Sequence, residues 1–201
     1  DLLTEGSRVC GVKVSFADPQ TGNPLEEEIK SSVVVLAIGH SARDTFSMLL
    51  DRQIPMEQKA FAVGLRIQHP QKMINLSQYG REDAGTLGAA NYKLTRQTKS
   101  GRGVYSFCMC PGGYVVNASS EEGRLAVNGM SYHARAGENA NSALIVTVTP
   151  EDFPESGPLS GVAFQRKLEE AAYRAAGGKI PVQLYGDFCK NAISTKLGDV
   201  V

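Results

Sequence analysis

The feature that most constrains this chain is an unbroken apolar run from Val33 to Ile38 that stops at Gly39. The run is rich in β-branched residues and does not alternate with polar ones, a pattern typical of a strand buried on both faces. The next residues, Ser41-Ala42-Arg43-Asp44, have the spacing of a capping box and predict the start of a helix. A buried strand that turns directly into a capped helix leaves backbone N–H groups at the positive end of the helix dipole, where a phosphate or a polarised ring can bind.

The remaining apolar patterns favour antiparallel strands and a few helices. They predict a hairpin at 10–16 and 25–29, a strand at 61–67 closed by Pro70, a three-stranded meander at 104–109, 114–118 and 124–130, and a strand at 143–149. Helical spacing predicts a short helix at 72–79 and a longer one at 162–176, ended by Gly177-Gly178. A doubly wound dinucleotide fold needs several strand-to-helix units, and only one is convincing here. We therefore expect an α+β fold with a mixed, largely antiparallel sheet and a few packed helices.

Composition excludes several classes of partner. The 201 residues are 42% hydrophobic and 21% charged, and 21 basic residues balance 21 acidic ones, which gives no electrostatic case for a nucleic acid or an anionic membrane surface. No apolar run approaches the roughly 20 residues that a transmembrane helix needs. We see no secretory signal, and the 4 cysteines are too scattered to form a secreted disulfide framework, so we expect a cytoplasmic protein.

Metal and standard nucleotide motifs are missing from the sequence. His40, His69 and His133 stand alone, and Cys108-Met109-Cys110 has no second closely spaced pair, so we predict no metal site. Neither a complete G-x-G-x-x-G nor a P-loop occurs. The polar stretch 92–103, which carries several lysines and arginines, is interpreted as a solvated loop or edge strand, with contact to substrate anions as the alternative.

The most suggestive local motif is the turn Cys110-Pro111-Gly112-Gly113. Proline fixes φ and the two glycines allow either a sharp turn or a close approach of the backbone to a ligand, so both a plain hairpin turn and a binding loop fit. A region rich in amides and hydroxyls follows and is suited to orienting a polar ligand or to capping turns; it includes Asn117, Asn128, Ser131 and Asn141.

Four stretches together resemble one family: Val34–Asp44, Phe61–Pro70, Ser106–Gly113 and Asn128–Ser131. They are similar to bacterial FAD-dependent dehydrogenases, relatives of the glutathione-reductase-like flavoproteins that carry an inserted domain. The segment ending in Ala37-Ile38-Gly39 looks like the second flavin-domain signature of that superfamily. The G-x-G-x-x-G of such proteins lies upstream of the region matched here, and a further flavin-contacting segment lies downstream, so the resemblance implies a central fragment of a larger protein.

The resemblance assigns parts of the chain to two different domains. Residues 1–46 would belong to the FAD-binding domain, with Gly39, His40 and Ser41 beside the cofactor. Residues 47–190 would form an inserted, substrate-facing domain, and 191–201 would return towards the FAD domain. The partners would be the missing flanking FAD-domain segments and a small-molecule substrate. FAD would be the cofactor of a hydride or electron transfer reaction, and NAD(P) could be a second cofactor. Candidates for the substrate side are Pro111, Gly112, Gly113, Asn117, Asn128 and Ser131.

Two other classes of function stay open. One is a non-catalytic ligand-binding or interaction module. The other is a thiol-dependent enzyme that uses Cys108 or Cys110 with a base such as His133, which are our candidates for catalytic residues.

Overall fold

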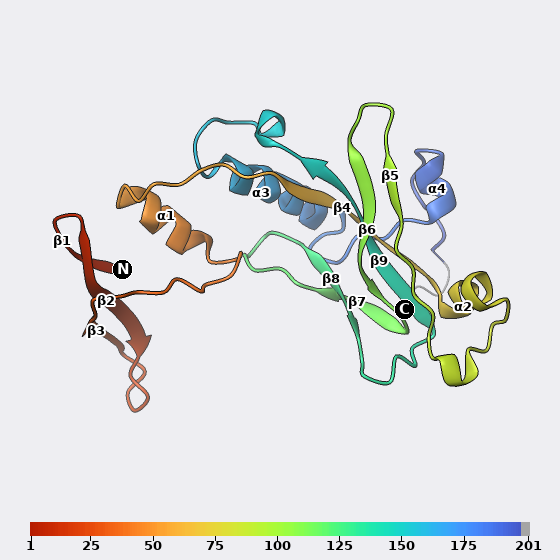
Figure 1. Cartoon of the computed structure of the whole chain (residues 1–201), viewed down its shortest axis with the longest axis horizontal. Coiled ribbons are helices and arrows are strands. Elements are labelled where there is room, and N and C mark those ends of the chain that lie inside the picture. Colours follow the sequence, from red (N-terminus) through yellow and green to blue (C-terminus); the bar gives the residue numbers. More distant parts are fainter. Residues whose placement is uncertain (198–201) are drawn as a thin grey trace. The chain divides into compact units, whose positions relative to one another are not determined.

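A computed structural model describes residues 1–197, and the chain divides into two compact units, Asp1–Glu57 and Gln58–Val201. The described residues contain helices and antiparallel sheets, which confirms the predicted α+β fold (Figure 1). The predicted return segment, 191–201, lies partly outside the described residues. No helix within residues 1–197 has the length and hydropathy that a bilayer crossing requires.

The first unit is a three-stranded antiparallel sheet followed by one helix. Strands β1 (Leu2–Glu5), β2 (Arg8–Ala17) and β3 (Pro24–Lys30) pair in that order, and helix α1 spans Arg43–Asp51. The predicted hairpin is confirmed, with Phe16 opposite Leu25 and Val12 opposite Ile29.

The prediction of a buried strand at Val33–Ile38 is wrong for this structure. The segment forms no strand, and Val33 is 72% and Val35 82% exposed. A strand becomes regular and buried only when neighbouring strands accept its hydrogen bonds and cover its faces. Nothing in residues 1–57 does so, since β1, β2 and β3 pair only with one another.

The predicted capping box is also wrong. The N-cap of α1 is Ala42, with no side-chain capping bond. Ser41 Oγ instead lies 2.9 Å from His40 Nδ1, and Asp44 accepts the N–H of Thr45 at 2.8 Å. Both side chains that would form the box therefore have other hydrogen-bond partners.

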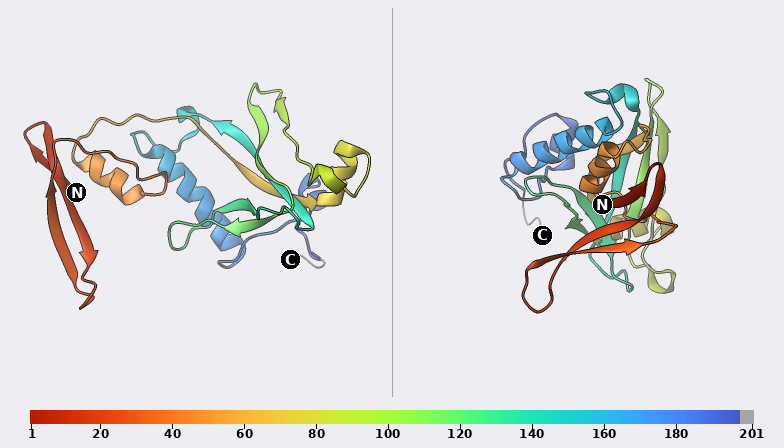
Figure 2. Two further views of the ribbon diagram at one scale, coloured as in Figure 1. Left: turned by 60° about the horizontal axis from the view of Figure 1, so that its bottom comes forward. Right: turned by 90° about the vertical axis from the view of Figure 1, so that its left-hand side faces the viewer.

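The second unit is built on a four-stranded antiparallel sheet. Its order is β4 (Phe61–Pro70), β9 (Asn139–Val148), β6 (Gly103–Cys110) and β5 (Thr95–Gln97), and the long strands β4 and β9 run side by side in Figure 2. The exposed edge strand β5 lies in the polar stretch 92–103, as one of the two readings of that stretch predicted. Strands β7 (Gly113–Asn117) and β8 (Val127–Ser131) form a separate hairpin that packs against β6 and β9.

The predicted meander is therefore corrected, because β6 pairs with β9 and not with β7. A bulge between Phe107 and Cys110 breaks the register of β6, and Cys108 has φ +44° there. Pro111 and Gly112 then carry the chain off the sheet into β7, so the turn at 110–113 joins two sheets and is not a plain hairpin turn.

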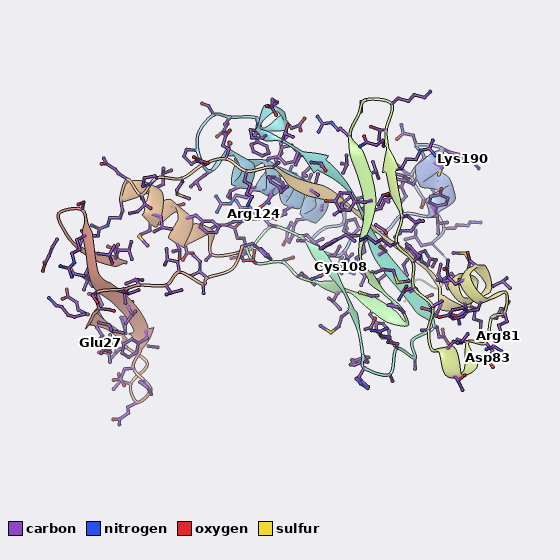
Figure 3. All side chains as sticks on the ribbon, viewed as in Figure 1. Glu27, Arg81, Asp83, Cys108, Arg124 and Lys190 are labelled. Carbon is purple, nitrogen blue, oxygen red and sulfur yellow. The ribbon has the colours of Figure 1, made fainter. Side chains whose placement is uncertain are left out.

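Helices and short 3-10 turns complete the second unit. Helix α2 (Gln71–Tyr79) and helix α3 (Ser160–Ala175) confirm the two predicted helices, while the 3-10 turns η1 (Gly85–Leu87) and η2 (Pro150–Asp152) and helix α4 (Tyr185–Cys189) were not predicted. Phe61, Phe153 and Phe164 pack with ring centroids 5.4–6.1 Å apart and join β4 to α3. Arg124, labelled in Figure 3, forms an ion pair with Glu170 of α3 at 3.0 Å.

Candidate functional site

A cavity of about 650 Å³ lies in the second unit, where three segments distant in sequence meet. One wall is the loop after η1, another is the end of β6, and the third is β8 with the loop that follows it. The lining residues are Leu87, Gly88, Ala89, Met109, Cys110, Pro111, Gly129, Met130, Ser131, Tyr132, His133, Ala134 and Arg135. The hollow is open to solvent, its lining mixes polar and apolar groups, and its volume is in the range of small-molecule sites.

The cavity brings together several residues that the sequence marked as site candidates: Cys110, Pro111, Ser131 and His133. Ser131 Oγ donates to the carbonyl oxygen of Pro111 at 2.7 Å and ties β8 to the turn. Their convergence from two parts of the chain makes this hollow the candidate substrate site.

Other candidates lie around the cavity without lining it. Cys108 is exposed at the bulge of β6, close to the β7–β8 hairpin (Figure 3). Gly112 and Gly113 belong to the turn itself and are buried. Asn117 is exposed at the end of β7 and accepts the N–H of Ser119 at 2.8 Å, a turn-capping role. Gly39, His40 and Ser41 belong to the first unit.

The glycine at 112 is required by packing. Its φ is +50°, and a Cβ there would lie 1.9 Å from the carbonyl oxygen of Arg135. The backbone of the turn at 110–113 is therefore in direct contact with the loop that carries Arg135, which forms the opposite wall. The two walls hold each other in place.

A buried amide pair on α2 fixes two of the walls and was missed in the sequence. Gln71 Oε1 accepts the N–H of Gly112 at 2.7 Å, and its Nε2 donates to Asn75 Oδ1 and to the carbonyl of Ala90, both at 2.9 Å. Asn75 Nδ2 donates to the carbonyl of Glu82 at 2.7 Å. The turn at 110–113 and the loop that carries residues 87–89 are therefore both anchored to one helix.

A second polar cluster lies behind the cavity and centres on Arg66 of β4. Its Nε donates to Asn141 Oδ1 at 2.7 Å, and its Nη2 donates to the carbonyl of Cys108 at 2.6 Å and lies 3.5 Å from Cys110 Sγ. Asn128, one of the predicted residues, has its Oδ1 at 3.5 Å from Nη1. Within residues 1–197 this guanidinium has no carboxylate in ion-pair distance.

Gly129 separates this cluster from the cavity. A Cβ at Gly129 would lie 2.0 Å from Arg66 Nη2 and 2.3 Å from Asn141 Oδ1, so the arginine occupies the space of a side chain behind the cavity wall. Asn141 is fully buried and its Nδ2 has no hydrogen-bond partner among the described residues. Because arginine is only a donor, the contact with Nε fixes the oxygen of this amide and leaves its N–H groups pointing elsewhere.

Two further titratable groups are His69, on the same strand β4, and Tyr92, in the loop before β5. Burial lowers the pKa of His69, whose Nε2 is buried and has no hydrogen-bond partner within residues 1–197, and its ring centroid is 5.5 Å from that of Tyr92. Burial also raises the pKa of the Tyr92 phenol, against the opposing effects of Ser142 and the charge of Arg66. Both groups are uncharged at neutral pH, so Arg66 supplies the fixed charge of this region.

No metal centre is formed in the described part of the chain. Among residues 1–197 no group of three or more His, Cys, Asp or Glu side chains is placed to hold an ion. All four cysteines are free thiols.

Comparison with known proteins gives one family and one uncharacterised relative. A family model described as "FAD-dependent protein, C-terminal domain-like" matches residues 60–201, which is nearly the whole second unit. A protein of Clostridium beijerinckii, described only as "Uncharacterized protein", is 59% identical over 179 residues. That match covers 87% of this chain but 34% of the relative, so the chain spans about a third of the relative's length.

Proposed function

Because the chain belongs to the family of FAD-dependent proteins with this C-terminal-like domain, we propose that it is part of an FAD-dependent oxidoreductase and that its second unit binds the small-molecule substrate. The family description names FAD and no nicotinamide cofactor, so NAD(P) does not enter the proposal.

The observation that carries this proposal is the cavity in the second unit. The family match and the cavity lie in the same unit, and the hollow gathers Cys110, Pro111, Ser131 and His133 from separate segments. In a flavoenzyme the cofactor supplies the redox chemistry, while the protein binds and orients the substrate. Anchored walls and a mixed apolar and polar lining suit that second role.

The flavin side is a separate question, and the described residues do not build a flavin cradle by themselves. Gly39 has φ +70° and open space where its Cβ would be, which leaves room for a ligand beside the backbone. The preceding segment, however, is exposed and unpaired, and residues 1–57 contain no parallel sheet. We propose that Gly39, His40 and Ser41 meet the cofactor only when the remaining two thirds of the full-length protein complete this domain, and we derive no chemical step through it.

One observation supports a thiol-dependent activity as a second candidate. Cys110 lines the cavity, and its Sγ lies 3.5 Å from a guanidinium that has no carboxylate partner in residues 1–197. A cation beside sulfur is a common feature of reactive cysteines. Cys108 is more exposed but outside the cavity, so a Cys108→Ser variant is the matched control for Cys110→Ser.

The test of the main proposal is the visible absorbance spectrum of the purified full-length Clostridium beijerinckii relative, measured beside that of this chain. We expect flavin bands in the full-length protein and none in the chain alone. A folded, colourless full-length protein that also fails to take up added FAD would contradict the proposal and leave a ligand-binding module without a flavin. In this chain, fast alkylation at neutral pH that is lost in the Cys110→Ser variant but not in Cys108→Ser would support the thiol candidate.

A further inference from the structure

The charge of the candidate substrate cavity is one-sided. Arg135 is the charged residue of its lining, and none of its lining residues is acidic. Asp83 and Glu138 are close in sequence to two of the walls, but neither lines the cavity, and Asp83 accepts the N–H of Gly85 at 2.9 Å. Arg135 has no carboxylate in ion-pair distance within residues 1–197. A cation at the rim without a protein counter-ion is available to a ligand.

A second cation lies behind the same wall. Arg66 is partly buried, and its Nη2 occupies the space where a side chain at Gly129 would be. Its hydrogen-bond partners among residues 1–197 are all neutral: the side chains of Asn128, Asn141 and Cys110 and the carbonyl of Cys108. Charges that are partly buried are screened less by solvent and salt than exposed ones, so this guanidinium adds to the positive potential in the cavity.

The other half of the lining is apolar and aromatic. Met130 is 57% and Tyr132 72% exposed, and the ring of Tyr132 meets that of Tyr114 edge to face at 6.0 Å. Met109 and Leu87 complete the apolar part of the lining. Exposed methionine and tyrosine side chains beside a cavity offer a surface for a flat apolar group.

The backbone that carries Arg135 is fixed by its surroundings. Arg135 has φ +48°, a conformation that non-glycine residues rarely adopt, and its N–H donates to the carbonyl of Tyr132 at 3.0 Å. Its carbonyl lies against Gly112, the position where no side chain fits. The turn that presents Arg135 is thus locked against the opposite wall, and strain of this kind persists only where the surroundings fix it.

From these observations we propose that the cavity binds a planar, aromatic or similarly flat apolar molecule that carries a carboxylate, with the carboxylate at Arg135 and the flat part beside Met130 and Tyr132. This inference rests on the proposed function in that it takes the cavity as the substrate site, and it names the class of substrate.

The test is an NMR titration of the 201-residue chain, labelled with nitrogen-15, with three probes: benzoate, its neutral isostere benzamide, and inorganic phosphate. We expect benzoate to shift the amide signals of residues 110–113 and 129–135. Its affinity should be about tenfold above that of benzamide, which lacks the charge-assisted contact, and about tenfold above that of phosphate, which lacks the apolar contact. The Arg135→Gln variant should reduce benzoate affinity to that of benzamide, and Arg135→Lys should restore part of the difference. Arg96→Gln, an exposed arginine on edge strand β5, is the matched control and should change nothing.

Each alternative result overturns a stated part of the proposal. Equal binding of benzamide and benzoate would refute the role of charge, and equal binding of phosphate would refute the apolar part. Benzoate shifts that survive in Arg135→Gln, or that map to the basic stretch 92–103, would refute the site. Absence of any shift at high benzoate concentration would refute the ligand class. The flavin spectrum of the full-length relative is independent of this titration, so failure of the ligand class and failure of the proposed function are separable.

Discussion

Replacing Arg66 by methionine tests the polar cluster behind the cavity. The change keeps an unbranched apolar stem but removes every donor of the guanidinium, of which the two shortest contacts are Nε to Asn141 Oδ1 at 2.7 Å and Nη2 to the carbonyl of Cys108 at 2.6 Å. The carbonyl of Cys108 belongs to an exposed residue and can bind water instead. Asn141 cannot, because it is fully buried and its Nδ2 already has no partner among the described residues. The variant therefore leaves the whole buried amide unsatisfied.

The expected loss follows from that amide. An unsatisfied buried polar group costs about 1–3 kcal/mol, and a bond from a charged donor is at the upper end of that range. Little is added for Cys108, so we expect the free energy of unfolding of the second unit to fall by about 2–3 kcal/mol. Removing Asn141 as well should recover part of the loss, because the double variant Arg66→Met/Asn141→Ala leaves no orphaned amide. The two single losses should thus fail to add by about 1–2 kcal/mol.

Tyrosine fluorescence during urea unfolding is the appropriate assay. The chain has no tryptophan, and all 7 tyrosines lie at Tyr79 or later, so the signal reports only the second unit. Arg96→Met on the exposed strand β5 is the control and should cost less than about 0.5 kcal/mol. A loss below about 1 kcal/mol for Arg66→Met, or full additivity with Asn141→Ala, would refute the reasoning that this arginine satisfies the buried amide.

Three further predictions use the same chain. Gly112→Ala should destabilise the second unit by at least about 2 kcal/mol in the tyrosine assay, because its Cβ would meet backbone atoms of Arg135 at 1.9 Å and 2.3 Å; an unchanged urea midpoint would show that the turn can move away. Burial lowers the pKa of His69 below 6.5, so the unfolded chain binds the proton more readily, and stability should fall as the pH drops below about 6.5 until the folded pKa is reached. The His69→Gln variant should flatten this slope in urea midpoints measured between about pH 7.5 and 5. An unaltered slope would count against the assignment to His69. The Arg102 guanidinium lowers the pKa of Asp152 to about 2, so the favourable contact is present above the ordinary pKa of 3.8 and is lost as the pH falls through about 2. The Arg102→Gln variant should move the pKa of Asp152 towards 3.8 in a carbon-13 carboxyl titration. No movement of that pKa would refute the assigned cause.

The parts of the fold that could be predicted are those in which local patterns and tertiary pairing agree. Apolar residues of β2, β4 and β9 recur in strand runs bounded by turn residues, and each of these strands finds an antiparallel neighbour within its own unit. Helix α3 has both helical spacing and a glycine pair with φ +56° and +86° at its end. In these elements, residues that are close in sequence are enough to predict the secondary structure.

The site was only partly predictable for the opposite reason. The motif at 108–113 was visible because proline and glycine mark a turn, but its supports come from far along the chain. Arg66 reaches the carbonyl of Cys108 across 42 positions, and Gln71 reaches the N–H of Gly112 across 41. One local signal could have indicated the arginine. Gly129 sits inside a strand pattern, and an isolated glycine there often marks the close approach of another group.

The failed strand at Val33–Ile38 follows from the same physical rule as the successful ones. An apolar β-branched run shows that a segment gains by burial, but a strand also needs neighbours that accept its hydrogen bonds. In the second unit the apolar runs of β4, β6 and β9 find those neighbours in one sheet, whereas in residues 1–57 this run finds none. The matched relative is about two and a half times as long as this chain, so it has further sequence that could supply such neighbours there. Questions about the flavin are therefore put to the full-length relative. Questions about the ligand can be put to this chain, because the cavity and its supports are built from residues 66–141 of one unit.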